Sequence, residues 1–109
     1  MRKPSADEER LIDALIRRST KELSEDWKSV LTVEAMNDGG MGSLLLFPEG
    51  RAVEKRVFGG VASKIEFKDE DGTAVLVSLN LDKDGKLLEV DIWKVDFTPL
   101  IRIPPLEGV

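Results

Sequence analysis

The spacing of hydrophobic positions along this 109-residue chain changes near Val30. Before that point, apolar residues recur with the spacing of a single helical stripe, at Leu11, Ile12, Leu15 and Ile16. The segment 5–8 (SADE) has the form of a capping box, in which a serine and a glutamate satisfy free amides at a helix start. The pattern therefore predicts a helix that begins after Ser5 and ends near Arg18.

A second, shorter helix is predicted between Thr20 and Val30. Thr20 has the side chain of an N-cap residue. Leu23, Trp27 and Val30 would then form the inner face of this helix. Both helices are interpreted as packing elements.

Beyond Val30 the polar and apolar residues alternate, which is typical of strands buried on one face. Turns rich in Asp, Asn and Gly separate five such segments, at 31–36, 43–47, 57–67, 73–81 and 86–97. The third segment carries Gly59 and Gly60, where a β-bulge is expected. The pattern predicts an α+β fold in one domain (1–109), with two N-terminal helices packed on a five-stranded antiparallel meander.

The net charge of −5 is concentrated in residues 69–97, which carry eight acidic and three basic side chains. Non-specific nucleic-acid binding draws on clustered Lys and Arg, so this acidic segment disfavours nucleic acid as a partner. It suits a basic protein partner instead. A charged face that only keeps the protein in solution has the same composition.

The chain contains neither cysteine nor histidine. Disulfides, Ser-His-Asp triads and zinc sites of the His/Cys type are therefore excluded, and no cofactor is indicated. No apolar run approaches the roughly 18 residues of a membrane span, and the charged start does not resemble a signal peptide. We expect a cytoplasmic protein that does not bind membranes.

The last strand carries the clearest candidate site. Alternation places Leu88, Val90 and Ile92 toward the core, and it places on the opposite face Glu89, Asp91, Trp93, Val95 and Phe97. Aromatic rings beside carboxylates are typical of an interface anchor, and neighbouring Asp96 adds to the charge. Two alternatives remain: the C-terminal tail folds over the rings, or a register slip buries Trp93.

Glu89 and Asp91 also allow a catalytic interpretation. Two residues apart on one strand face, they lie about 6.6 Å from each other along the strand. Repulsion between two such carboxylates raises the pKa of one of them, as in the acid–base pair of a small hydrolase. An acidic strand exposed to solvent explains the same residues without catalysis.

Two loops contain residue types that bind ligands in other proteins. The glycine-rich segment 36–43 lacks the ending of a phosphate-binding loop, but Asn37, Asp38 and Met41 could adapt to a partner. A sharp connection between strands is the alternative. The segment 82–85 (DKDG) begins like a calcium loop, yet its twelfth residue is Trp93 where such loops carry Glu, so it is interpreted as a turn.

Two blocks of the sequence, 36–43 (MNDGGMGS) and 91–100 (DIWKVDFTPL), resemble a family of small uncharacterised bacterial proteins, a domain of unknown function. The charged first helix and the turn at 80–85 fit the same family, so the resemblance covers most of the chain. It implies a shared fold, and it supplies no catalytic residues.

The leading hypothesis from the sequence is a non-enzymatic protein-binding module, of the immunity-protein kind, that inhibits a basic partner. Its surface would consist of the outer face of the last two strands and the 37–43 loop. The alternatives are a small hydrolase using the Glu89–Asp91 pair and a structural domain that self-associates through a strand edge. The sequence leaves the oligomeric state open.

Overall fold

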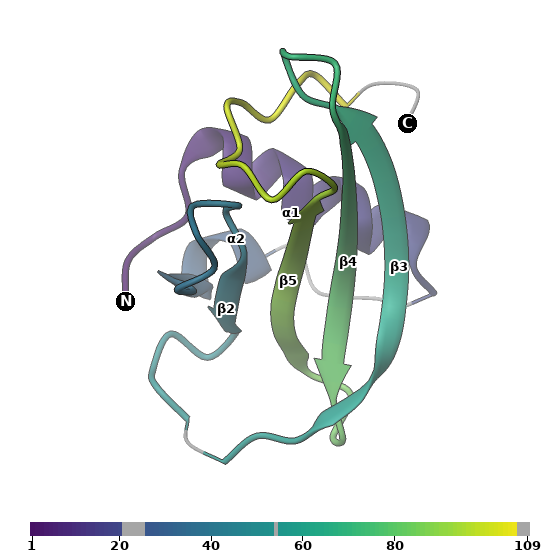
Figure 1. Cartoon of the computed structure of the whole chain (residues 1–109). Helices are drawn as coiled ribbons and strands as arrows, with labels where there is room; N and C mark the ends of the chain where they lie inside the picture. The colour runs from purple at the N-terminus through teal and green to yellow at the C-terminus, as the bar shows by residue number, and fades with distance from the viewer. Residues whose placement is uncertain (21–25, 54, 107–109) are drawn as a thin grey trace.

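The chain folds into a single antiparallel sheet with a long helix across one face (Figure 1), in a computed structural model that describes residues 1–20, 26–53 and 55–106. In chain order the elements are α1 (Ala6–Arg18), α2 (Trp27–Val30), β1 (Thr32–Ala35), β2 (Leu44–Phe47), β3 (Phe58–Lys68), β4 (Ala74–Asp82) and β5 (Leu87–Lys94). The predicted α+β class and the five antiparallel strands are confirmed.

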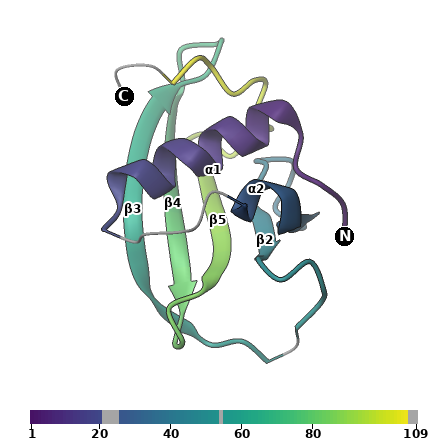
Figure 2. The same cartoon turned by 180° about the vertical axis from the view of Figure 1, so that it is seen from behind.

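Helix α1 begins and ends where its sequence predicts. The Ser5 hydroxyl accepts a hydrogen bond from the Glu8 amide at 3.1 Å, and the Glu8 carboxylate accepts one from the Ser5 amide at 2.8 Å. All four residues of the apolar stripe are buried against the sheet. Figure 2 shows α1 lying obliquely across β3 and β4, so this helix covers the inner face of the sheet.

The second helix differs from its prediction. Helix α2 has one turn only and begins at Trp27, with Asp26 as its N-cap residue. Trp27 packs against the core, but Val30 is 40% exposed, so the prediction that Val30 lies on the inner face is wrong. A four-residue helix has only about one turn, which is too short to present a long apolar stripe to the core. Leu23 lies outside the described residues.

The strand order is β1-β2-β5-β4-β3, so the predicted meander is wrong. Strand β2 pairs with β5 instead of β3, and the connection after β2 runs past the end of the sheet to its far edge (Figure 1). Arg56 fixes this connection by donating hydrogen bonds to the carbonyl oxygens of Leu46 at 2.5 Å and Leu87 at 3.2 Å. Alternation predicts which segments are strands, but it does not specify which strands pair.

Strand β3 carries the predicted bulge. Its register with β4 shifts between Phe58 and Gly60, and again between Val61 and Ser63. A Cβ atom on Gly59 would lie 2.3 Å from the carbonyl oxygen of Asp82, so only glycine fits where the two backbones approach.

A buried ion cluster closes one end of the sheet. Lys94, the last residue of β5, is only 1% exposed. Its Nζ atom lies 2.9 Å from a carboxylate oxygen of Asp69 and 2.8 Å from one of Asp71, and it donates to the carbonyl oxygen of Pro99 at 3.2 Å. The cluster therefore joins β5, the β3–β4 turn and the C-terminal tail.

Asp69 also holds the tail directly. Its carboxylate accepts hydrogen bonds from the amides of Ile101 at 2.8 Å and Arg102 at 3.2 Å. Burial raises the pKa of the Asp69 carboxyl, but hydrogen bonds from the Ile101 amide, Lys94 and other backbone amides outweigh it and lower the pKa to about 2. The tail thus covers the end of the core, where Ile103 is buried.

We predict that Asp69→Ala destabilises the fold by about 3–5 kcal/mol, because it leaves a buried ammonium short of one partner and two tail amides without an acceptor. Glu70→Ala is the matched control. Glu70 is the next residue in the same turn, and its exposed ion pair with Arg102 predicts a loss of less than about 1 kcal/mol. Urea unfolding measures both. Equal losses in the two variants would contradict a stabilising role for the cluster.

Acid should weaken the protein through the same carboxylate. Because the folded-state pKa of Asp69 lies below its ordinary value, its contribution is complete above about pH 4 and is lost as the pH falls toward about 2. We expect the melting temperature of the native chain to fall over this window more steeply than that of Asp69→Ala. Parallel curves would show that Asp69 is not the titrating group.

Candidate functional site

In the described part of the chain no helix covers the sheet face opposite α1 (Figure 1), and alternation along β5 places its candidate residues on that face. Ile92 and Lys94 point inward and are buried, whereas Asp91 is exposed and Trp93 is 41% exposed. The predicted faces of the last strand are therefore confirmed, and the alternative in which a register slip buries Trp93 is wrong. We call this face, from β3 to β5, the outer face.

Residues of three strands form two rows across the outer face. The backbone register aligns Asp91, Ser78 and Lys64 in one row, and Trp93, Leu76 and Glu66 in the next. Neighbouring strands lie about 4.8 Å apart, so opposite ends of a row are separated by about 10 Å. The apolar pair Trp93 and Leu76 thus lies next to the charged side chains of both rows.

Trp93 makes an aromatic contact that the sequence alone does not specify. Its ring centroid lies 4.7 Å from that of Phe97, with an interplanar angle of 75°. The sequence predicted a strand that continues to residue 97, but β5 ends at Lys94. Phe97 therefore reaches Trp93 through a turn. Trp93 is 41% exposed and Phe97 is 65% exposed, so the described part of the tail does not cover the two rings. Edge-to-face pairs of this kind contribute about 0.5–1.5 kcal/mol.

The backbone at Phe97 is unusual. Its φ angle of 65° lies in the left-handed region, where a bulky L-residue costs roughly 1–2 kcal/mol. The turn is fixed on both sides, since the Phe97 amide donates to the Lys94 carbonyl at 2.9 Å and the Thr98 hydroxyl donates to Asp96 at 2.6 Å. The fold therefore holds an exposed ring in a strained conformation.

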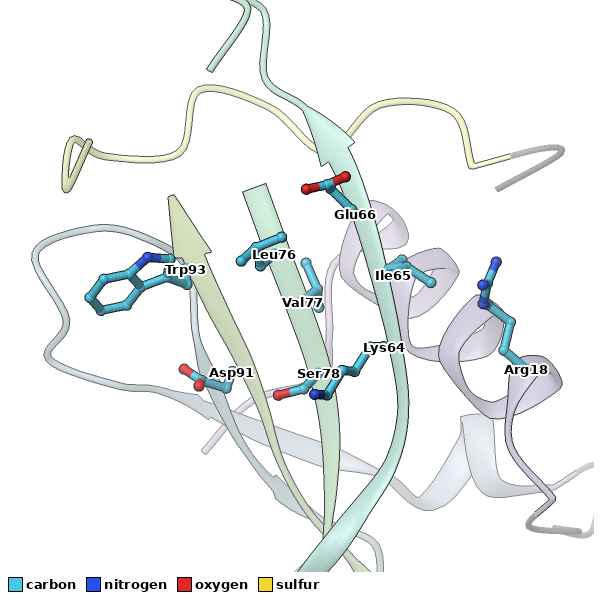
Figure 3. Close-up of a pocket in the computed structure, with 9 residues that line it drawn as sticks. All are labelled: Arg18, Lys64, Ile65, Glu66, Leu76, Val77, Ser78, Asp91 and Trp93. Carbon is cyan, nitrogen blue, oxygen red and sulfur yellow. The ribbon is translucent and has the colours of Figure 1, made fainter. Parts of the chain in front are cut away.

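A hollow of about 470 Å³ lies next to these residues. Figure 3 shows Asp91 and Trp93 side by side on β5, with Leu76 and Ser78 on the adjacent strand β4. Lys64 and Glu66 of β3 line it as well, and Arg18 lies at the end of α1 behind that strand (Figure 3). The hollow combines an apolar floor with charged margins, which is the usual composition of a binding site.

The acidic side chains of this face affect one another. The pKa of Asp91 is raised, first by burial and next by the negative charges of Glu89 and Asp38. Glu89 does not line the hollow, and its carboxylate accepts a hydrogen bond from the side-chain amide of Asn80 at 3.0 Å. The other side-chain atom of that amide, Asn80 Oδ1, is buried without a hydrogen-bond partner among the described residues.

The glycine-rich loop is a structural connection held against the tail. The Leu100 amide donates to the Gly40 carbonyl at 3.0 Å, and a Cβ atom on Gly40 would meet Pro99 at 3.2 Å. Met41 is 9% exposed, and its sulfur accepts a hydrogen bond from the Lys94 amide at 3.4 Å. Met41 is therefore too buried to contact a partner.

The other predicted site residues lie at the surface in different settings. Asn37 is exposed, whereas Asp38 is half-buried and accepts a hydrogen bond from the Ser43 amide at 2.9 Å. Asp96 is exposed, and the Thr98 hydroxyl and amide lower its pKa. Both aspartates thus cap turns, while the outer face brings together only Glu89, Asp91, Trp93 and Phe97.

The hollow includes residues that the sequence analysis did not select. Leu76, Lys64 and Glu66 complete the two rows from β4 and β3. One signal was available: Leu76 is a large apolar residue on the polar face of its strand, and it is exposed. The contribution of β3 depends on the strand order, which alternation does not give.

The described residues contain no group of three or more acidic side chains that could hold a metal ion. Among the described helices, none has the length and apolar character needed to cross a membrane.

The chain matches the family model of DUF6984, a domain of unknown function, over residues 1–104. It therefore belongs to this family, in agreement with the resemblance of its two sequence blocks. No curated protein and no solved structure matches the chain.

The electrostatics of the outer face can be tested by titration. We predict that Asp91 titrates above its ordinary pKa and that Glu89→Gln lowers this pKa part of the way back, since burial, the larger cause, remains. Carboxyl-carbon NMR shifts followed against pH give both values. Glu66→Gln removes a carboxylate of the same face that does not perturb Asp91, and an equal effect in this control would refute the assignment.

Proposed function

We propose that this protein is a non-enzymatic binding module and that its outer face takes a basic protein partner. The observation that carries the proposal is the exposed Trp93–Phe97 pair, which lies beside Asp91 on a sheet face that none of the described helices covers. Large aromatic residues near the centre of an interface supply most of its binding energy. Carboxylates around them raise the association rate with a basic partner and select against acidic ones.

The cost of presenting these rings supports a binding role. Leaving Trp93, Phe97 and Leu76 exposed forgoes the burial energy that each would gain in a core, about 1.5–3 kcal/mol for an average apolar side chain. The left-handed backbone at Phe97 adds strain. A partner that buries the rings would recover the apolar part of this cost.

The geometry favours binding over hydrolysis. A carboxylate pair that acts on one substrate must face one site. Here Asp91 lines the hollow, whereas Glu89 lies outside it and is hydrogen-bonded to Asn80. Inhibition of a basic protein, as an immunity protein does, is the form of binding that best suits the small size of the chain and its acidic segment 69–97.

The experiment is an affinity capture of the tagged protein from its native host, followed by a binding measurement with the purified partner. We expect a basic partner whose affinity drops at least tenfold in Trp93→Ala, because the ring is the central anchor. Phe58→Ala is the matched control, since Phe58 is a similarly exposed aromatic at the far end of β3.

A second pair of variants tests the charge. Asp91→Lys should weaken binding and reduce its salt dependence, whereas Asp84→Lys makes the same charge change at the far end of β5 and should have little effect. Circular dichroism confirms that each variant is folded. A partner that binds all four variants equally would place the interface elsewhere and refute the proposal.

A further inference from the structure

We propose that the hollow on the outer face is a recognition site for a single arginine side chain of the partner, with its guanidinium against Trp93 and Asp91. This inference rests on the proposed function and specifies the chemistry that the partner must present. It predicts selectivity for arginine over lysine, which charge attraction alone does not give.

The indole and the carboxylate are spaced so that one guanidinium can contact both. Asp91 and Trp93 are two residues apart on one strand face, so they are about 6.6 Å apart along β5 and point the same way (Figure 3). A guanidinium is planar, stacks on an aromatic face and donates two parallel hydrogen bonds to a carboxylate. An ammonium is a point charge and cannot make both contacts with one rigid group.

The floor of the hollow fits the rest of an arginine side chain. Leu76 lies beside Trp93 in one row, and Ser78 lies beside Asp91 in the other. The three methylene groups of an arginine side chain would lie on Leu76, and the hydroxyl of Ser78 can accept a further N–H. The volume of about 470 Å³ leaves room for the backbone on either side of the arginine.

Asp91 has no cationic partner among the described residues. Its carboxylate is in no ion pair in the described part of the chain, although seven other acidic residues are paired, namely Asp7, Glu8, Asp13, Glu49, Asp69, Glu70 and Asp71. Burial and nearby negative charge raise the pKa of Asp91, so a cation brought beside it would relieve an unfavourable environment.

The far margin of the hollow orients the ligand. Lys64 stands at the opposite end of the row that contains Asp91, about 10 Å away across two strand spacings. A guanidinium is attracted to the Asp91 end and repelled from the Lys64 end. A partner segment that carries an arginine next to an acidic residue would place the arginine beside Asp91 and the acidic residue beside Lys64.

The test uses small probes, which need no partner to be known. N-acetyl-arginine-N-methylamide is titrated into the labelled protein, and NMR follows the indole N–H of Trp93 and the pH titration of Asp91. The lysine and citrulline analogues are matched probes, since the first keeps the charge and the second keeps the planar shape. We expect saturable shifts at Trp93, a lower pKa for Asp91, and affinity for arginine at least threefold above either analogue.

Variants locate the site. Asp91→Asn should reduce arginine affinity about tenfold and abolish the preference over citrulline, whereas Asp84→Asn, an exposed acid at the far end of β5, should change neither. Equal binding of arginine and lysine, or shifts that do not include Trp93, would overturn the inference. No shift at tens of millimolar probe would also overturn it.

These outcomes separate the inference from the proposed function. A captured partner that is lost in Trp93→Ala but binds Asp91→Asn normally would support the outer face as an interface and refute the arginine site. Selective arginine binding without any protein partner would support the site and refute the function as a protein-binding module.

Discussion

The structure depends on the burial of one ammonium group. Removing Lys94 from water carries a desolvation cost of several kcal/mol, which only close partners can offset. Two carboxylates of the β3–β4 turn and the Pro99 carbonyl provide them, so the end of β5 and the tail that follows it must meet a turn 23–25 residues earlier in the chain. The ion pairs of Lys94 and the apolar contacts of the tail together close this end of the sheet.

The same requirement produces the exposed aromatic pair. Because Lys94 must point inward and its carbonyl accepts from the Phe97 amide, the chain turns immediately after β5 and returns Phe97 to Trp93. Since side chains alternate along a strand, the residue before a buried lysine faces outward. Strand β5 thus holds the fold together with one face and presents Trp93 and Asp91 with the other.

The features that could be predicted from the sequence are local ones. Helix α1, its capping box, the bulge at Gly59 and the two faces of β5 follow from periodicity and turn chemistry within a few residues. The pairing of β2 with β5 and the burial of Lys94 could not be predicted in this way. Both depend on partners many residues away, and lysine is among the residues least often buried.

The segments 36–43 and 91–100 contact each other, and their contacts distinguish residues that the fold requires from exposed residues that it does not. Gly40 packs against Pro99, and the Met41 sulfur accepts a hydrogen bond from the Lys94 amide. The fold requires these four residues. No comparable contact requires an exposed indole in β5 or a phenyl ring in a strained turn, where a polar residue or glycine would be more stable. Exposed residues that cost stability and lie outside the hydrophobic core are those for which a binding function is the best explanation.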